Sequence, residues 1–447
     1  MSPVKKIRAG LVAVCAAIAI TAVLAPASAM AAQKAPAIPQ SSCFWTNEIA
    51  SKFNSDPENN YAFPDTGAVY WTSKIEIPDG ASVILKGKYA HSRYQSINSY
   101  DAVTHSPTDA LNDVSTVPNK GSTNPYLPGA NRDAKKRSYT ATIVNEPVPA
   151  TKAQNTLYAG VAGQPRQTLM YRVYLPDDYK SPRELTGGVG LPKAELRLSD
   201  GSLLTGQAAC DALQVQSGRL DLTTLSQSAY EAFRVQPGKP DTFPAEEKPV
   251  FNAFYNVQFS LSCYFLGNCP ANPARTGGQY SNIDNNYVLS FVNRGFSDGP
   301  VLVLHGKMPT TPDTGPGVKR MGRGQMRYWS MCQNESLFTT KGAGCVYDSQ
   351  VPLGKHREYT IVTSAAADRP KNAKAKCGVA YIPWPAAGDG DGHLNDGMLL
   401  VRNMLPSSKF HQAVQDTKTP GDEASVMGPY LPSGTYTTKA AFEQKGC

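Results

Sequence analysis

The chain has 447 residues, a length typical of two or three domains, and it includes 37 Gly and 35 Pro. Its formal net charge of +8 is small for this length, and the cations are spread along the sequence apart from Lys135, Lys136 and Arg137. This distribution predicts an ordinary solvated surface, open to weak contact with an acidic cell wall, and excludes an extended nucleic-acid-binding face.

The first expected element is a secretory signal peptide at residues 1–31. Lys5, Lys6 and Arg8 precede an apolar run at 9–24, and small residues follow at 27–31. This pattern predicts a secreted, extracellular protein. Removal of the segment would leave a net charge of +5. No later stretch approaches about 18 uninterrupted apolar residues, so we expect no membrane span in the mature chain.

An internal duplication organises the remainder. Residues 79–88 match residues 298–307 without a gap, and four shorter matches follow in the same order. These matches pair Arg93-Tyr94 with Arg327-Tyr328, Asp113 with Asp348, Arg137 with Arg357, and Arg172 with Arg402. The duplication predicts a first copy at 32–182, a connector at 183–280, a second copy at 281–408 and a C-terminal tail at 409–447.

The matched segments predict β-strands because they are short and rich in β-branched, leucine and tyrosine residues. The expected strands are 81–85, 138–144, 169–175, 301–304 and 358–363. Many short strands separated by Gly and Pro predict a mainly β fold, with a β-sandwich or jelly-roll domain in each copy. Apolar spacing predicts short helices in the connector at 204–213 and 223–233, and in the tail at 410–415 and 437–444.

Eight cysteines follow the signal peptide, an even number that predicts four disulfides and no free thiol in an oxidising compartment. No CxxC pair is present, which argues against a zinc site. Cys263 and Cys269 are the expected local bridge. The other pairings are not determined by spacing, and our preferred assignment is Cys332 with Cys345, Cys43 with Cys210, and Cys377 with Cys447.

Two tracts of the first copy resemble exported proteins related to the group called domain of unknown function 1214. They are Gly87-Lys88 followed by Arg93-Tyr94-Gln95-Ser96-Ile97-Asn98, and the tract that ends in Arg172-Val173-Tyr174-Leu175-Pro176. The resemblance implies a β-sandwich architecture and names no reaction. The second copy departs from this pattern, with Cys332 in the place of Asn98.

Side chains of the first copy are candidates for general acid–base catalysis, which needs a histidine close to a carboxylate. The candidate catalytic residues are His91, Arg93, Asp101 and Asp113. A GxSxG pattern at 295–299 fits a serine-hydrolase elbow, but a strand follows it where a helix is needed, so a turn is the preferred interpretation.

The repeated Arg-Tyr pairs suggest a ligand site, because guanidinium groups bind carboxylates and aromatic rings stack on sugars. The candidate ligand-binding residues are Tyr94, Arg137, Arg327 and Trp329, and the alternative is that these arginines pair with structural acids such as Asp113 and Asp348.

An acidic, glycine-rich loop at 389–397 is a candidate metal site. Asp389, Asp391 and Asp396 offer the oxygen ligands that Ca²⁺ prefers, although the loop lacks the final glutamate of an EF-hand. A metal-free polar loop is the competing interpretation, and no other cofactor is expected.

Taken together, these features favour a secreted protein that binds a small molecule or a cell-wall component without catalysis. The alternative is an extracellular hydrolase or lyase with its site in the first copy, and a purely structural wall protein is a third hypothesis.

Overall fold

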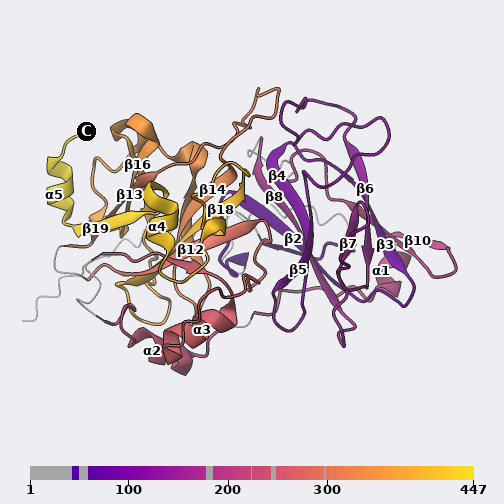
Figure 1. The fold of residues 1–447 in the computed structure, drawn as a ribbon, viewed down its shortest axis with the longest axis horizontal. Coiled ribbons are helices and arrows are strands. Elements are labelled where there is room, and N and C mark those ends of the chain that lie inside the picture. Colours follow the sequence, from indigo (N-terminus) through magenta and orange to yellow (C-terminus); the bar gives the residue numbers. More distant parts are fainter. Residues whose placement is uncertain (1–42, 50–58, 178–184, 223, 243–247, 296–298) are drawn as a thin grey trace, which may run out of the picture. The chain divides into compact units, whose positions relative to one another are not determined.

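The computed structural model describes residues 43–49, 59–177, 185–222, 224–242, 248–295 and 299–447, which belong to one compact unit. The chain is mainly β, with four sheets of four or five strands and a few short helices (Figure 1). The predicted signal peptide lies outside the described residues. In the described part of the chain, no helix combines the length and apolar character that a bilayer span requires.

Two sheets build the first half. The first inner sheet has the order β1 (Asn47–Ile49), β2 (Ala68–Ile75), β8 (Gln167–Pro176), β4 (Ser92–Tyr100), β5 (Pro107–Asn112). The first outer sheet has the order β10 (Leu203–Thr205), β9 (Lys193–Arg197), β3 (Ser82–Lys88), β6 (Ser138–Val144), β7 (Thr156–Tyr158).

The second half repeats the strand order of the inner sheet. Its outer sheet, written below in the opposite direction, repeats four of the five outer strands and has no counterpart of β10. The second inner sheet contains β11 (Asn252–Phe254), β12 (Asn285–Asn293), β18 (Asp396–Pro406), β14 (Met326–Asn334), β15 (Gly342–Tyr347). The second outer sheet contains β17 (Val379–Pro383), β16 (Glu358–Ser364), β13 (Val301–Lys307), β19 (Ser433–Thr437). The β6–β7 and β16–β17 pairs are both parallel. The predicted tandem sandwich-like architecture is therefore confirmed.

Strand register shows that matched residues occupy equivalent positions. Gly87 pairs with Tyr139 in the first half, and Gly306 pairs with Tyr359 in the second. A Cβ atom on either glycine would lie 2.4 Å from the paired tyrosine side chain, so both positions need glycine for the close approach of the ring.

The sheets also take strands from outside the predicted copies. β9, β10 and β11 come from the connector, and β19 comes from the tail. These strands have only three to five residues, too few to show an alternating pattern in the sequence. The helices are α1 (Gly206–Ala212), α2 (Gln227–Arg234), α3 (Val257–Leu266), α4 (Glu423–Met427), α5 (Lys439–Gln444).

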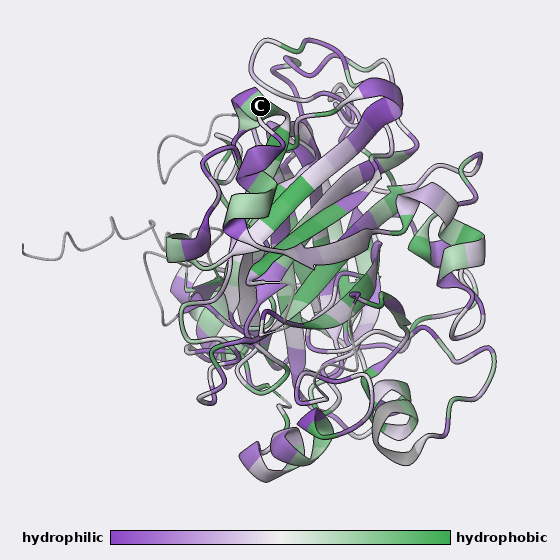
Figure 2. Cartoon of the chain, turned by 90° about the vertical axis from the view of Figure 1, so that its left-hand side faces the viewer, coloured by the Kyte–Doolittle hydropathy of each residue, from purple (hydrophilic) through white to green (hydrophobic). Residues whose placement is uncertain are grey.

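Each half has its own hydrophobic core, and a third cluster joins the two inner sheets. Figure 2 shows hydrophobic residues concentrated on the strands. Tyr94 and Tyr174 of the first inner sheet pack with Tyr328 and Met404 of the second. Every residue of β4 is buried, because one face of this strand covers its own sandwich and the other face covers the opposite half.

Reciprocal ion pairs cross between the inner sheets. Arg93 Nη1 binds Asp348 Oδ1, and Arg327 Nη1 lies 3.3 Å from Asp113 Oδ1. Each aspartate also accepts a backbone N–H from its own half, Asp113 from Gln95 at 3.0 Å and Asp348 from Trp329 at 3.2 Å. The acids predicted for the two arginines are therefore the right ones, but each arginine binds the acid of the other copy.

Four disulfides link the cysteines in the preferred assignment. They join Cys43 to Cys210, Cys263 to Cys269, Cys332 to Cys345, and Cys377 to Cys447. The first bridge links the segment that precedes β1 to α1, which follows the connector strands β9 and β10 of the first outer sheet.

Candidate ligand cavity

A cavity of about 300 Å³ opens between the two inner sheets and the connector, and we call it the central cavity. Most of its wall is apolar. The apolar lining residues include Leu225, Phe254, Val257, Leu261, Leu289 and Leu400. The polar part of the wall contains the two matched arginines, Arg172 of β8 and Arg402 of β18. Both are 3% exposed, and each faces a tyrosine of the neighbouring strand, Tyr70 or Tyr287.

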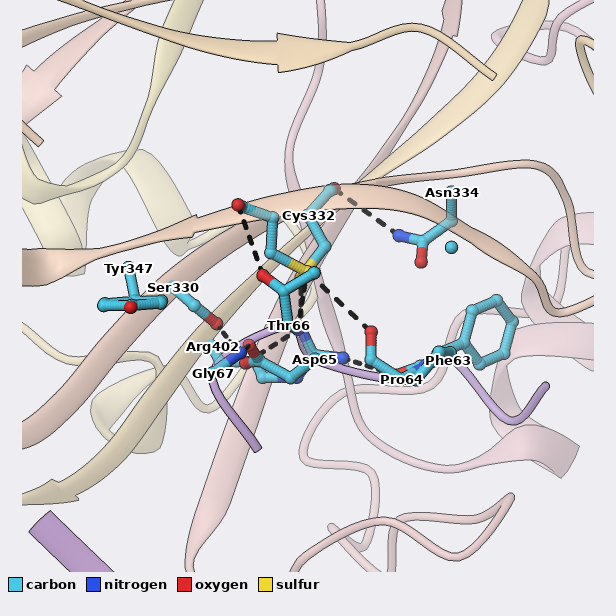
Figure 3. Close-up of a disulfide and its surroundings, with 12 residues drawn as sticks. Phe63, Pro64, Asp65, Thr66, Gly67, Ser330, Cys332, Asn334, Tyr347 and Arg402 are labelled. Carbon is cyan, nitrogen blue, oxygen red and sulfur yellow. Dashed lines mark hydrogen bonds and ion pairs between the residues drawn. A yellow bond between two sulfur atoms is a disulfide. The ribbon is translucent and has the colours of Figure 1, made fainter. Parts of the chain in front are cut away.

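Arg402 is neutralised within the protein. Its Nη1 lies 3.5 Å from Asp65 Oδ2 and donates to Cys332 Sγ at 2.7 Å, while Nη2 donates to the Phe63 carbonyl at 2.6 Å. Figure 3 shows Arg402 and Asp65 beside the Cys332–Cys345 disulfide. Asp65 also accepts from Ser330 Oγ at 2.6 Å, so this buried carboxylate is fully paired.

Arg172 has the same surroundings except for the carboxylate. Nη1 donates to Asn98 Oδ1 at 2.7 Å, and Nη2 donates to the Tyr280 carbonyl. Asn98 and Tyr280 occupy the places of Cys332 and Phe63 in the other half. Within the described part of the chain, Arg172 has no ion-pair partner.

Asn282 stands where the other half has Asp65. Asp65 Oδ1 accepts from the Gly67 N–H at 2.8 Å and from the Tyr328 hydroxyl at 2.9 Å. Asn282 Oδ1 accepts from the Asp284 N–H at 3.2 Å and from the Tyr94 hydroxyl, also at 3.2 Å. A neutral amide therefore replaces the carboxylate beside Arg172.

Two side chains of the cavity wall carry a buried donor that has no hydrogen-bond partner among the described residues, Arg172 Nε and Asn282 Nδ2, and so does Asn98, whose Oδ1 binds Arg172 but which does not line the cavity. The amide orientations are fixed, because Asn98 Oδ1 accepts from a guanidinium and Asn282 Oδ1 accepts from a backbone N–H. Buried polar groups are normally hydrogen-bonded, so three unpaired donors beside one cation point to a missing acceptor.

The predicted catalytic residues do not come together. Arg93 binds Asp348 and Thr314, and Asp101 Oδ1 accepts the Val103 and Thr104 N–H groups of its own turn. Burial together with Arg137 and Arg132 lowers the pKa of His91 to about 4. No hydrogen bond or ion pair among the described residues links any two of His91, Arg93, Asp101, Asp113. Ser297 of the GxSxG pattern lies outside the described residues.

The predicted ligand-binding residues lie outside the central cavity wall. Tyr94 donates to Asp284 and Asn282, Arg137 donates to the Ala134 and Tyr89 carbonyls, and Trp329 packs against Tyr359. Arg327 forms the crossed ion pair described above. The duplication did mark Arg172 and Arg402, but their place in the cavity depends on residues far away in the sequence.

At the predicted calcium loop, Asp389, His393 and Asp396 have ligand atoms within 4.8 Å of one another. Arg234 already provides positive charge there, with Nη2 2.6 Å from Asp396 and Nε 3.6 Å from Asp389. Asp391 accepts from Gln227 at 2.9 Å. A Ca²⁺ ion would have to compete with Arg234, and calcium binding stays a prediction.

We expect Asp113 to make stability depend on pH. Burial, opposed by Arg327, raises the pKa of Asp113 to about 7. The folded state therefore holds this proton more tightly than the unfolded state, whose pKa is near 4. The stabilising contribution is present below about pH 4 and is lost as the pH rises through 7.

Chemical denaturation of the wild type and of Asp113→Asn across this range tests the expectation. The variant carries a neutral side chain at every pH, so the wild type should lose stability relative to it between pH 4 and 7. A constant difference between the two proteins would contradict the raised pKa.

Comparisons with known proteins show no family. No family model matches the chain, and no curated protein matches it, so the resemblance to domain of unknown function 1214 stays a prediction. Among solved structures, an uncharacterized protein from Burkholderia cenocepacia is similar with 10% identity and a TM-score of 0.46, over 90% of this chain and 83% of that one. A protein from Vibrio parahaemolyticus is similar with 11% identity and a TM-score of 0.40, over 86% of this chain and 93% of that one.

Proposed function

We propose that this is an exported, disulfide-stabilised protein that binds a small, largely apolar molecule in the central cavity without catalysing a reaction. The observation that carries the proposal is the cavity itself. A space of about 300 Å³ with an apolar wall and a few fixed polar groups is typical of small-molecule sites. Export is supported by the signal-like first 31 residues and by the pairing of all eight remaining cysteines.

Binding, rather than catalysis, is supported by the chemistry of the wall. The cavity brings together guanidinium, amide, phenol and apolar groups, and none of its lining residues is a histidine, a carboxylate or a cysteine. A general acid–base pair therefore does not line the described part of the cavity.

Calorimetric titration with octanol, an uncharged apolar probe, tests this function. We expect octanol to bind the wild-type protein and Leu225→Trp to abolish binding, because Leu225 lines the cavity and is only half-buried, so a larger ring fills the space. The matched control is Leu394→Trp, since Leu394 is 57% exposed and does not line the cavity.

The control variant should bind octanol as the wild type does. Absence of binding to the folded wild type, or equal binding by Leu225→Trp, would refute the function.

A further inference from the structure

The two arginine sites of the central cavity differ in one decisive respect. At the Arg402 site, Asp65 Oδ2 faces Ser330 and the guanidinium and supplies the negative charge. At the Arg172 site, the corresponding atom is Asn282 Nδ2, because Oδ1 of that amide already accepts two hydrogen bonds. An N–H donor therefore lies where the other half places a carboxylate oxygen.

This exchange leaves the buried Arg172 guanidinium with neutral hydrogen-bond acceptors and no carboxylate in contact with it. Ser96, the counterpart of Ser330, donates to Asn98 instead of to residue 282. Buried charges are strongly unfavourable unless they are paired, and the unpaired donors on Arg172, Asn98 and Asn282 add to the cost.

Asp284 interacts electrostatically with Arg172, but its hydrogen-bond partners are other residues. Its carboxylate accepts from the Tyr94 hydroxyl at 2.6 Å and from Asn112 Nδ2 at 3.0 Å, not from Arg172. Burial raises the pKa of Asp284, and its hydrogen bonds from Tyr94 and Asn112 together with the charge of Arg172 oppose this shift.

The geometry points to an organic monocarboxylate as the ligand, with its charged group bound by Arg172 and its apolar body along Leu289, Met398 and Leu400. This inference rests on the proposed function. A carboxylate offers acceptors for the two unpaired donors of the cavity wall, Arg172 Nε and Asn282 Nδ2. A single negative charge suffices, because Asp65 already neutralises Arg402, and a doubly charged phosphate would bury a charge without a partner.

Asn282 is then the residue that determines specificity. Asn282→Asp would give the Arg172 site the internal carboxylate that Asp65 gives to Arg402, and a ligand carboxylate would meet a like charge. The substitution preserves shape, and the opposite half shows that aspartate fits these surroundings.

Titration with octanoate and octanol, which differ in charge and share an apolar chain, tests the inference. We expect wild type to bind octanoate at least about tenfold more tightly than octanol, in line with the worth of a charge-assisted hydrogen bond. Asn282→Asp should lose this preference, because its affinity for octanoate falls relative to its own affinity for octanol. Asn282→Ala, which removes the amide without adding charge, should keep most of the preference.

The outcomes separate the two proposals. Equal wild-type affinity for octanoate and octanol, or an unchanged preference in Asn282→Asp, would overturn the carboxylate inference and leave the cavity function standing. Failure of both probes to bind would overturn both. If thermal unfolding shows that Asn282→Asp does not fold, the carboxylate inference is tested by the preference of the wild type for octanoate over octanol.

Discussion

Replacing Asp348 by alanine is expected to lower the free energy of unfolding by about 3–5 kcal/mol, since it leaves Arg93 buried without its partner. The Arg93 and Asp348 side chains are only 3% and 2% exposed. The substitution also removes the acceptor of the Trp329 N–H. Urea denaturation followed by tryptophan fluorescence measures the loss.

The control is Lys86→Ala, which breaks the Lys86–Glu195 pair, because the lysine side chain is 55% exposed. We expect that variant to lose no more than about 1 kcal/mol. In the double variant Arg93→Met/Asp348→Leu, both charges are gone, so it should be more stable than Asp348→Ala. If Asp348→Ala lowers the free energy of unfolding by no more than Lys86→Ala does, the crossed ion pairs do not stabilise the contact between the two halves.

Removal of the Cys43–Cys210 disulfide is the second change with a large expected effect. The bridge closes a loop with a sequence separation of 167 residues, whereas Cys263–Cys269 spans 6. The chain-entropy model assigns about 5 kcal/mol to a loop of the first size and about 2 kcal/mol to one of the second.

We therefore expect Cys43→Ser/Cys210→Ser to unfold at a clearly lower urea concentration than Cys263→Ser/Cys269→Ser. Thiol alkylation of the denatured mature protein, from which the predicted signal peptide with Cys15 has been removed, should add no label, in agreement with four complete bridges. An equal loss of stability in the two double variants would show that loop length does not control their contributions.

Local patterns were enough to predict several strands and the number of disulfides. The strand at 138–144 was predicted with its observed limits, because Tyr, Thr, Ile and Val alternate between buried and half-buried positions. Cysteine parity predicted four disulfides and local spacing predicted Cys263–Cys269, whereas the other three pairings agree with a preferred assignment that spacing did not determine. The strand pattern is contained within one segment, and the number of disulfides follows from counting the cysteines.

The candidate site could not be predicted in this way. Its main feature is the lack of a carboxylate beside Arg172, which depends on Asn282, a residue more than a hundred positions away. One signal was available: aligning Tyr70 with Tyr287 without a gap places Asp65 opposite Asn282. The crossing of the ion pairs could not be predicted either. Each copy contains both an arginine and an aspartate at matched positions, so the sequence does not show which aspartate each arginine binds.

The crossed ion pairs also have the symmetry of a dimer interface. An arginine of each copy bound to an aspartate of the other is the contact pattern of a two-fold symmetric homodimer, in which one surface patch meets its own duplicate. In such a dimer the residues at positions 65 and 282 would be encoded once and would be identical in both subunits. In a single chain the two positions can differ, and here Arg402 has an internal acid in Asp65 whereas Arg172 has the neutral Asn282 in the corresponding place.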